Sequence, residues 1–147
     1  LFPDVRLKRF LEMRGADGGP LSRIAALPAF WVGLLYDAEA LSAAETLTRD
    51  WTFDEVQALR DAVPVQGLDA PFRGGRLFDV AQDAVRISRL GLKNRARRNA
   101  SGEDETIFLA PLEEMLAKGT TLAQDLLADY QGSWKHSVDP AFAAFRY

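Results

Sequence analysis

The residues best suited to chemistry lie close together near the start of the chain. Glu12 and Arg14 stand two residues apart in the segment from Val5 to Arg14, in which charged and apolar residues alternate. Because successive side chains of a strand point to opposite faces, both would project from one face, with Arg6 and Lys8 behind them. A carboxylate suits Mg²⁺, and an arginine can bind phosphate and stabilise charge during phosphoryl transfer. From spacing alone, an ordinary solvated strand face is the simpler interpretation.

The element expected to position these side chains is a single strand over residues 5–14. Its apolar residues alternate with the charged ones, and Gly15 followed by Gly18-Gly19-Pro20 would end it in a sharp turn. A single strand cannot satisfy its own backbone groups. We therefore expect it either to pair with strands outside this sequence or to hang from a helical bundle.

Helical patterns fill the rest of the chain, with Pro28 expected to kink or split the first helix and Gly119 to end the fifth. Thr52 with Glu55, and Thr121 with Gln124, have capping-box spacing. We predict a structured loop over 64–75, a polar linker over 99–106, and helices over 22–36, 37–49, 52–63, 76–98, 106–118, 121–130 and 141–145. The predicted fold class is α+β, mostly helical with one N-terminal strand: residues 1–20 form the strand and turn, and residues 21–147 the helical part.

Composition excludes several classes of function. The net charge of −3 and the pI near 5.2 give no general attraction to nucleic acid or anionic lipid. The chain has no cysteine and one histidine, so disulfides, thiolate metal sites and histidine clusters are ruled out. The longest apolar stretch, residues 24–36, contains Pro28 and is shorter than the about 20 residues that a membrane-spanning helix needs. We expect neither a nucleic-acid nor a membrane partner, and a cytoplasmic location.

Five segments, in order, closely resemble the glutamate-cysteine ligase family of plants and proteobacteria. They are FPDVRLKRFLEMRGADGGP at 2–20, ALPAFWVGLLYD at 26–37, DWT at 50–52, PFRGG at 71–75 and SVDP at 137–140. The resemblance covers essentially the whole chain. Together with a start that lacks methionine, it implies the C-terminal third of such an enzyme and the C-terminal part of a single catalytic domain.

The resemblance implies a reaction and a site. The family phosphorylates the γ-carboxylate of glutamate with ATP, after which the cysteine amine displaces phosphate, in the first step of glutathione synthesis. Its fold is similar to that of glutamine synthetase, so the N-terminal strand would belong to a curved antiparallel catalytic sheet. Glu12 would then bind Mg²⁺ and Arg14 would contact the transferred phosphoryl group, with Arg6 and Lys8 as nucleotide-binding candidates and Asp17 as a weaker one.

Other parts of the enzyme would complete the site. The remaining metal ligands and the groups that grip glutamate would come from the N-terminal remainder, so this piece alone should be inactive. Two alternatives stay open at this stage. One is another carboxylate-amine ligase that uses the same Glu-x-Arg arrangement, and the other is a noncatalytic helical interaction domain in which residues 5–14 form an extended arm.

Overall fold

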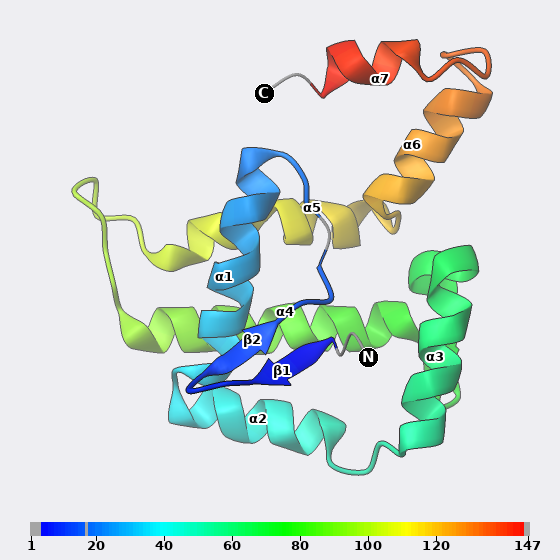
Figure 1. Cartoon of the computed structure of the whole chain (residues 1–147). Helices are drawn as coiled ribbons and strands as arrows, with labels where there is room; N and C mark the ends of the chain where they lie inside the picture. Colours follow the sequence, from blue (N-terminus) through cyan, green and yellow to red (C-terminus); the bar gives the residue numbers. More distant parts are fainter. Residues whose placement is uncertain (1–3, 17, 146–147) are drawn as a thin grey trace.

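Three helices pack together at the centre of the computed structural model, which describes residues 4–16 and 18–145. They are α1 (Leu21–Leu35), α2 (Ala38–Thr48) and α4 (Leu77–Arg95). Helix α4 is the longest, and α1 crosses it while α2 lies along it (Figure 1). The predicted helices in these three regions are confirmed, but Pro28 does not split the first one, because α1 runs unbroken through it.

Helices α1 and α4 approach so closely that their backbones touch. A Cβ atom placed on Gly91 of α4 would lie 1.9 Å from the carbonyl oxygen of Gly33 in α1. One placed on Gly33 would lie 2.3 Å from the backbone oxygen of Ser88. The fully buried Ser88 hydroxyl donates a hydrogen bond of 2.9 Å to the carbonyl oxygen of Phe30. Only glycine, which has no side chain, permits this crossing distance.

The apolar core lies on two sides of this crossing. Leu92 of α4 packs with Ala29 of α1 and with Leu109, which ends the 3₁₀ helix η2 (Glu105–Leu109). Helix α5 (Ala110–Lys118) continues from η2. A second cluster joins Leu34, Ala40 and Ile87, from α1, α2 and α4. Apolar burial therefore holds α1, α2, α4 and the η2–α5 segment together as one body.

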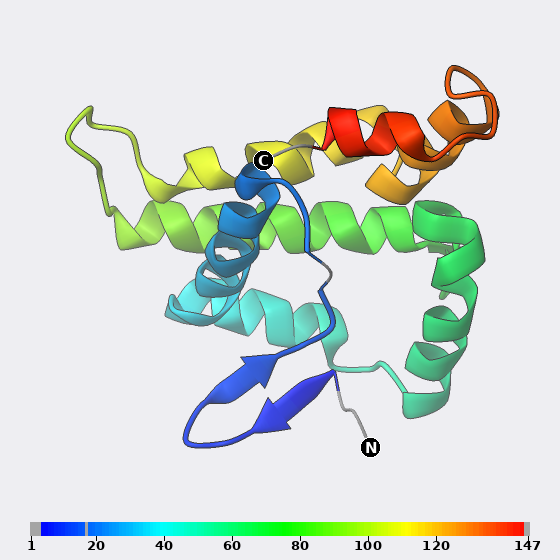
Figure 2. The same ribbon diagram turned by 45° about the horizontal axis from the view of Figure 1, so that its top comes forward.

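Two further groups of elements extend from the same end of this body (Figure 1). Between α2 and α4 lie α3 (Phe53–Gln66), η1 (Gly67–Asp69) and a short hairpin of β3 (Pro71–Phe72) and β4 (Gly75–Arg76). Helices α6 (Leu122–Gln131) and α7 (Asp139–Ala144) form an arm beyond α5, which Figure 2 shows from a second side.

Side-chain caps fix where several helices begin. The backbone N–H of Thr52 donates to Glu55 at 2.8 Å and that of Glu55 donates to the Thr52 hydroxyl at 3.2 Å. Thr121 and Gln124 make the same reciprocal pair. These satisfy N–H groups that a helix start leaves unpaired, so both predicted capping boxes are confirmed.

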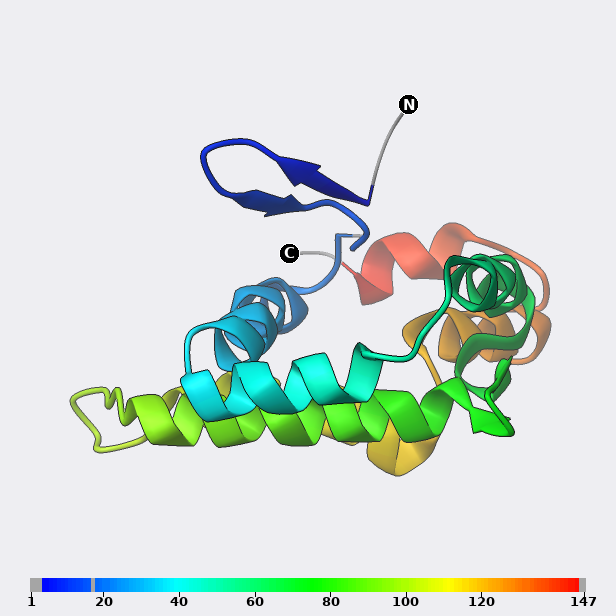
Figure 3. The same ribbon diagram turned by 90° about the horizontal axis from the view of Figure 1, so that it is seen from below.

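The single strand predicted over residues 5–14 is wrong. The chain instead forms an antiparallel hairpin of β1 (Val5–Leu7) and β2 (Leu11–Met13), in which Val5 pairs with Met13, Arg6 with Glu12, and Leu7 with Leu11. Residues 8–10 bend the chain back on itself. The strand thus finds a partner inside the described chain, and the hairpin stands away from the helices (Figure 3). The α+β class holds, with only two short two-stranded sheets in the described residues.

Three other boundaries differ from the sequence prediction. Helix α3 continues through Pro64 to Gln66 and ends at Gly67, whose φ is +55°. No described residue of α3 is buried, so a carbonyl left without its N–H partner by the proline can meet water. Helix α4 ends at Arg95, because Ala96 adopts a left-handed conformation. The helix predicted over 106–118 divides into η2 and α5, which Gly119 ends as predicted.

Within the described residues, no single helix is long and apolar enough to cross a membrane. Helices α1 and α2 reach that length and composition only as a pair bent by 91°.

Candidate functional site

The polar face of the β1–β2 hairpin gathers three of the four predicted site residues. Arg6 and Glu12 are register partners, and the Arg6 Nε and Nη2 atoms both lie 2.7 Å from Glu12 Oε2. Lys8 Nζ lies 3.4 Å from the same oxygen. Side chains of residues paired directly across an antiparallel ladder share a face, which brings Arg6 to Glu12. The hairpin therefore builds a cation–carboxylate cluster that a single strand would not.

The cluster sets the protonation state of Glu12. The hydrogen bond from Arg6 lowers the pKa of Glu12 below its ordinary value of 4.5. Desolvation opposes this shift, and the charges of Arg6 and Lys8 lower the pKa further. Opposite charges and hydrogen bonds to the ionised form both favour a carboxylate. Glu12 is therefore ionised at neutral pH, as a metal ligand or an anchor for cations must be.

Arg14 lies directly after β2, at the open end of the hairpin. Its backbone N–H donates a 2.7 Å hydrogen bond to the carbonyl oxygen of Asp4, which closes that end. Its position is thus fixed by the same hairpin that carries Glu12. The weaker candidate Asp17 lies outside the described residues.

The donor set of the hairpin suits an anion together with one cation ligand. Arg6 and Lys8 supply two positive charges against the single carboxylate of Glu12. Among the described residues, no group of three His, Cys, Asp or Glu side chains could hold a metal ion. Glu12 Oε2 holds both Arg6 and Lys8. Because Mg²⁺ takes one or two carboxylates plus phosphate oxygens and waters, Glu12 can supply one ligand here.

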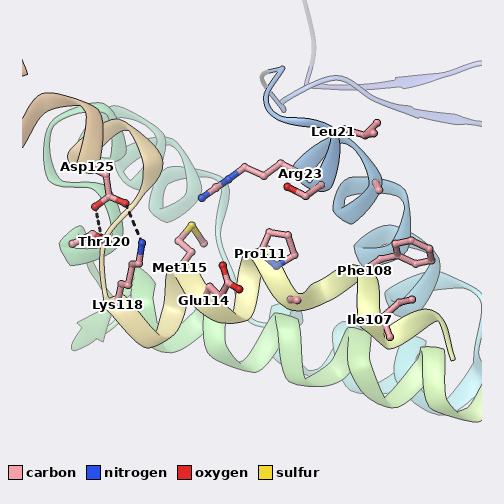
Figure 4. Close-up of a pocket in the computed structure, with 13 residues that line it drawn as sticks. Leu21, Arg23, Ile107, Phe108, Pro111, Glu114, Met115, Lys118, Thr120 and Asp125 are labelled. Carbon is pink, nitrogen blue, oxygen red and sulfur yellow. Dashed lines mark hydrogen bonds and ion pairs between the residues drawn. The ribbon is translucent and has the colours of Figure 1, made fainter. Parts of the chain in front are cut away.

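A second candidate is a groove with a volume of about 860 Å³ between the start of α1, the η2–α5 segment and the start of α6. Leu21 and Phe108 form its walls on one side, and Pro111 and Met115 lie along its floor (Figure 4). We call it the α1–α5 groove. Sequence reasoning did not identify it, because its residues come from three elements far apart in the chain.

The chain is similar to known proteins over its whole length. The model of the glutamate-cysteine ligase family 2 (GCS2) matches residues 1–144. The chain is 50% identical over 147 residues to the proteins named "Glutamate--cysteine ligase, chloroplastic" of Nicotiana tabacum and Arabidopsis thaliana, covering 100% of this chain and 27% of each relative. It is 48% identical to "Glutamate--cysteine ligase A, chloroplastic" of Oryza sativa subsp. indica, covering 29% of that relative.

These names correct one expectation and support others. The predicted cytoplasmic location is contradicted, because the relatives are named chloroplastic. An absence of cysteine within this segment was too weak a signal of compartment to carry that prediction. The predicted resemblance and enzyme class are confirmed, because the family model matches 144 of the 147 residues and the relatives are named glutamate--cysteine ligases. The chain spans 27–29% of the length of these relatives. The chain belongs to the glutamate-cysteine ligase family 2.

Proposed function

We propose that residues 1–147 form the C-terminal part of the catalytic domain of a longer glutamate-cysteine ligase. The complete enzyme would use ATP to activate the γ-carboxylate of glutamate as a γ-glutamyl phosphate, which the cysteine amine then attacks. Family membership supports the reaction class. The observation that carries the role of this segment is the Arg6–Glu12–Lys8 cluster on the hairpin, with Glu12 Oε2 shared by two cations at 2.7 and 3.4 Å.

The cationic residues of the hairpin would bind the phosphate groups of ATP. A guanidinium has five N–H donors in a planar fork, so Arg6 can hold Glu12 and still offer donors to a phosphate oxygen. Arg14 would contact the phosphoryl group in transfer, and Lys8 would add a point charge nearby. Donors held in place by a hairpin stabilise developing charge with little reorganisation.

Glu12 would have two roles in this arrangement. Its Oε2 atom fixes the orientation of Arg6, and the carboxylate would also take part in holding Mg²⁺. When bound, Mg²⁺ neutralises phosphate charge as it shifts between oxygens. The remaining ligands, and the groups that bind glutamate and cysteine, would come from the part of the enzyme outside this chain.

The hairpin would pair with further strands in the complete enzyme, as part of a curved antiparallel sheet similar to that of glutamine synthetase. Two features support this proposal. The apolar face opposite the charged cluster is uncovered, with Leu7 80% exposed and Leu11 57% exposed. A lone two-stranded hairpin is marginal in water, because it needs further strands or packing against helices. The isolated segment should therefore be inactive.

The test is ATP-dependent γ-glutamylcysteine formation by the complete enzyme. We expect Glu12→Gln and Arg14→Ala to lower kcat by about 100-fold or more, the scale for removing one charge-stabilising group from an active site. Arg9→Ala is the matched control, because Arg9 lies in the same hairpin outside the cluster; it should stay within about threefold of wild type. Near-normal activity of Glu12→Gln and Arg14→Ala, with unchanged gel-filtration elution and circular dichroism, would show that these residues only form a solvated strand face.

A further inference from the structure

We propose that the α1–α5 groove is the docking surface for the part of the same polypeptide that lies outside residues 1–147. This inference rests on the proposed function, since it requires a longer enzyme. Beyond the proposed function, it specifies which face of the helical body the remainder of the polypeptide covers.

The apolar residues that line the groove are more exposed than is usual for apolar residues gathered on the surface of a complete protein. Leu21 is 76% exposed, Phe108 44% and Ile107 41%, and all three line one continuous depression with Pro111 and Met115. Scattered apolar residues are normal on a surface, whereas apolar side chains gathered in one hollow mark an interaction site.

The charged residues of the groove indicate what the occupant must carry. Arg23 extends from α1 across the opening, and Glu114 lies on the α5 side (Figure 4). Neither side chain has an ion-pair partner within the described residues. At the far end, Asp125 is engaged, because it accepts from Thr120 at 2.8 Å and lies 4.0 Å from Lys118. The groove therefore fits an apolar segment flanked by an acidic and a basic side chain.

The length of the relatives indicates that the remainder of the same polypeptide is long enough to be this occupant. The segment spans 27–29% of its relatives, so more than two thirds of each relative lies outside it. That remainder must also reach the hairpin, whose apolar face is uncovered. Because α1 starts shortly after β2, the hairpin and one wall of the groove belong to one continuous stretch of chain, which the remainder can cover as one surface.

A second groove on the same body provides the contrast. It lies between α2 and α4 and has a volume of about 560 Å³. Five of its eight lining residues are polar or charged, among them Glu39, Thr46 and Asp83, and the others are Ala43, Leu47 and Ile87. Arg86 there is already paired with Asp83 at 3.0 Å. We infer that this polar groove faces solvent in the complete enzyme.

The experiment compares two serines of the complete enzyme. Ser22 lines the α1–α5 groove and Ser42 lines the polar groove; both are exposed in helices, and both accept cysteine with nearly the same shape. This segment has no native cysteine, so a labelled peptide from it reports only the introduced thiol. We expect iodoacetamide to label Ser22→Cys at least about tenfold more slowly than Ser42→Cys in the native enzyme, and both equally in denaturant.

Several outcomes would overturn the proposal. Equal native labelling of the two variants would leave the groove open. Protection that disappears on dilution would mean that a second copy covers it, and protection that appears only with ATP and glutamate would mean that a small ligand does. If Ser22→Cys does not fold, hydroxyl-radical footprinting of the wild type decides, because Phe108 should be modified only after denaturation. Labelling does not depend on catalysis, so a Glu12→Gln enzyme with near-normal activity and a protected groove would refute the proposed site alone.

Discussion

Replacing Gly91 by alanine should separate helices α1 and α4. The new Cβ atom would lie 1.9 Å from the carbonyl oxygen of Gly33 and 2.9 Å from the Cβ atom of Ala40. A carbon–oxygen contact requires about 3.2 Å or more, and the clashing atom is backbone, which cannot rotate away. The helices must therefore part by more than about 1 Å.

The expected loss of stability follows from two opposing effects. Overpacking a tight site costs about 1–3 kcal/mol, and the upper end applies because backbone has to move. Alanine favours a helix over glycine by about 1 kcal/mol, which leaves a net loss of about 2 kcal/mol. At 1.4 kcal/mol per tenfold change, that corresponds to roughly a 30-fold larger open population of this helix pair.

Native-state amide hydrogen exchange of the complete enzyme measures this directly, with peptides that span α1 and α4 followed by mass spectrometry. We expect protection to fall roughly 30-fold in both helices together. Gly18→Ala is the control, because a Cβ atom at Gly18 meets nothing within 4 Å. Unchanged protection in Gly91→Ala would refute the inference that the two backbones touch.

Three further changes test other parts of the structure. Leu92→Ala removes a fully buried side chain and should cost about 2–5 kcal/mol, seen as faster exchange in α4 and η2. Thr52→Ala removes the cap of α3 and should cost about 1 kcal/mol, seen as faster exchange confined to the first turn of α3. Because Arg6 lowers the pKa of Glu12, the stabilisation from this pair is present above the ordinary value of 4.5 and is lost as the pH falls through the lowered value. Arg6→Ala should therefore raise the pKa of Glu12 toward 4.5 in an NMR carboxyl titration, while the pKa of Asp37, lowered by the backbone N–H of Ala40 and by Asn94, should not move.

Helix starts and stops were predictable from sequence where their causes are local. The capping box of Thr52 and Glu55 spans one turn, and Gly119 ends α5 with a left-handed φ of +72° that glycine adopts readily. Pro64 misled the prediction because the same residue is tolerated in a helix whose surroundings are solvent. The touching backbones of Gly33 and Gly91 depend on a crossing between distant segments, which no local pattern reports.

The sequence pattern did not predict the hairpin, for a geometric reason. Its paired residues are 5 with 13, 6 with 12 and 7 with 11. Both residues of a pair therefore have odd numbers or both have even numbers. The alternation of apolar and charged residues in β1 therefore continues in the same phase in β2, although Arg9 and Phe10 interrupt it, and the two strands together resemble one long strand. Residues 8–10 are Lys-Arg-Phe, without the Gly, Asn or Pro that usually signals a turn. The predicted placement of Arg6, Lys8 and Glu12 on one face was nevertheless correct, because even-numbered residues share a face both in one long strand and in this hairpin.

The most direct test of the proposed site is a crystal structure of the complete enzyme with Mg²⁺ and a non-hydrolysable ATP analogue. We expect a Glu12 carboxylate oxygen about 2.0–2.1 Å from a magnesium ion, with the Arg14 guanidinium within hydrogen-bond distance of a phosphate oxygen. A nucleotide bound elsewhere, with the charged face of the hairpin in contact only with solvent, would contradict the proposed role of this segment.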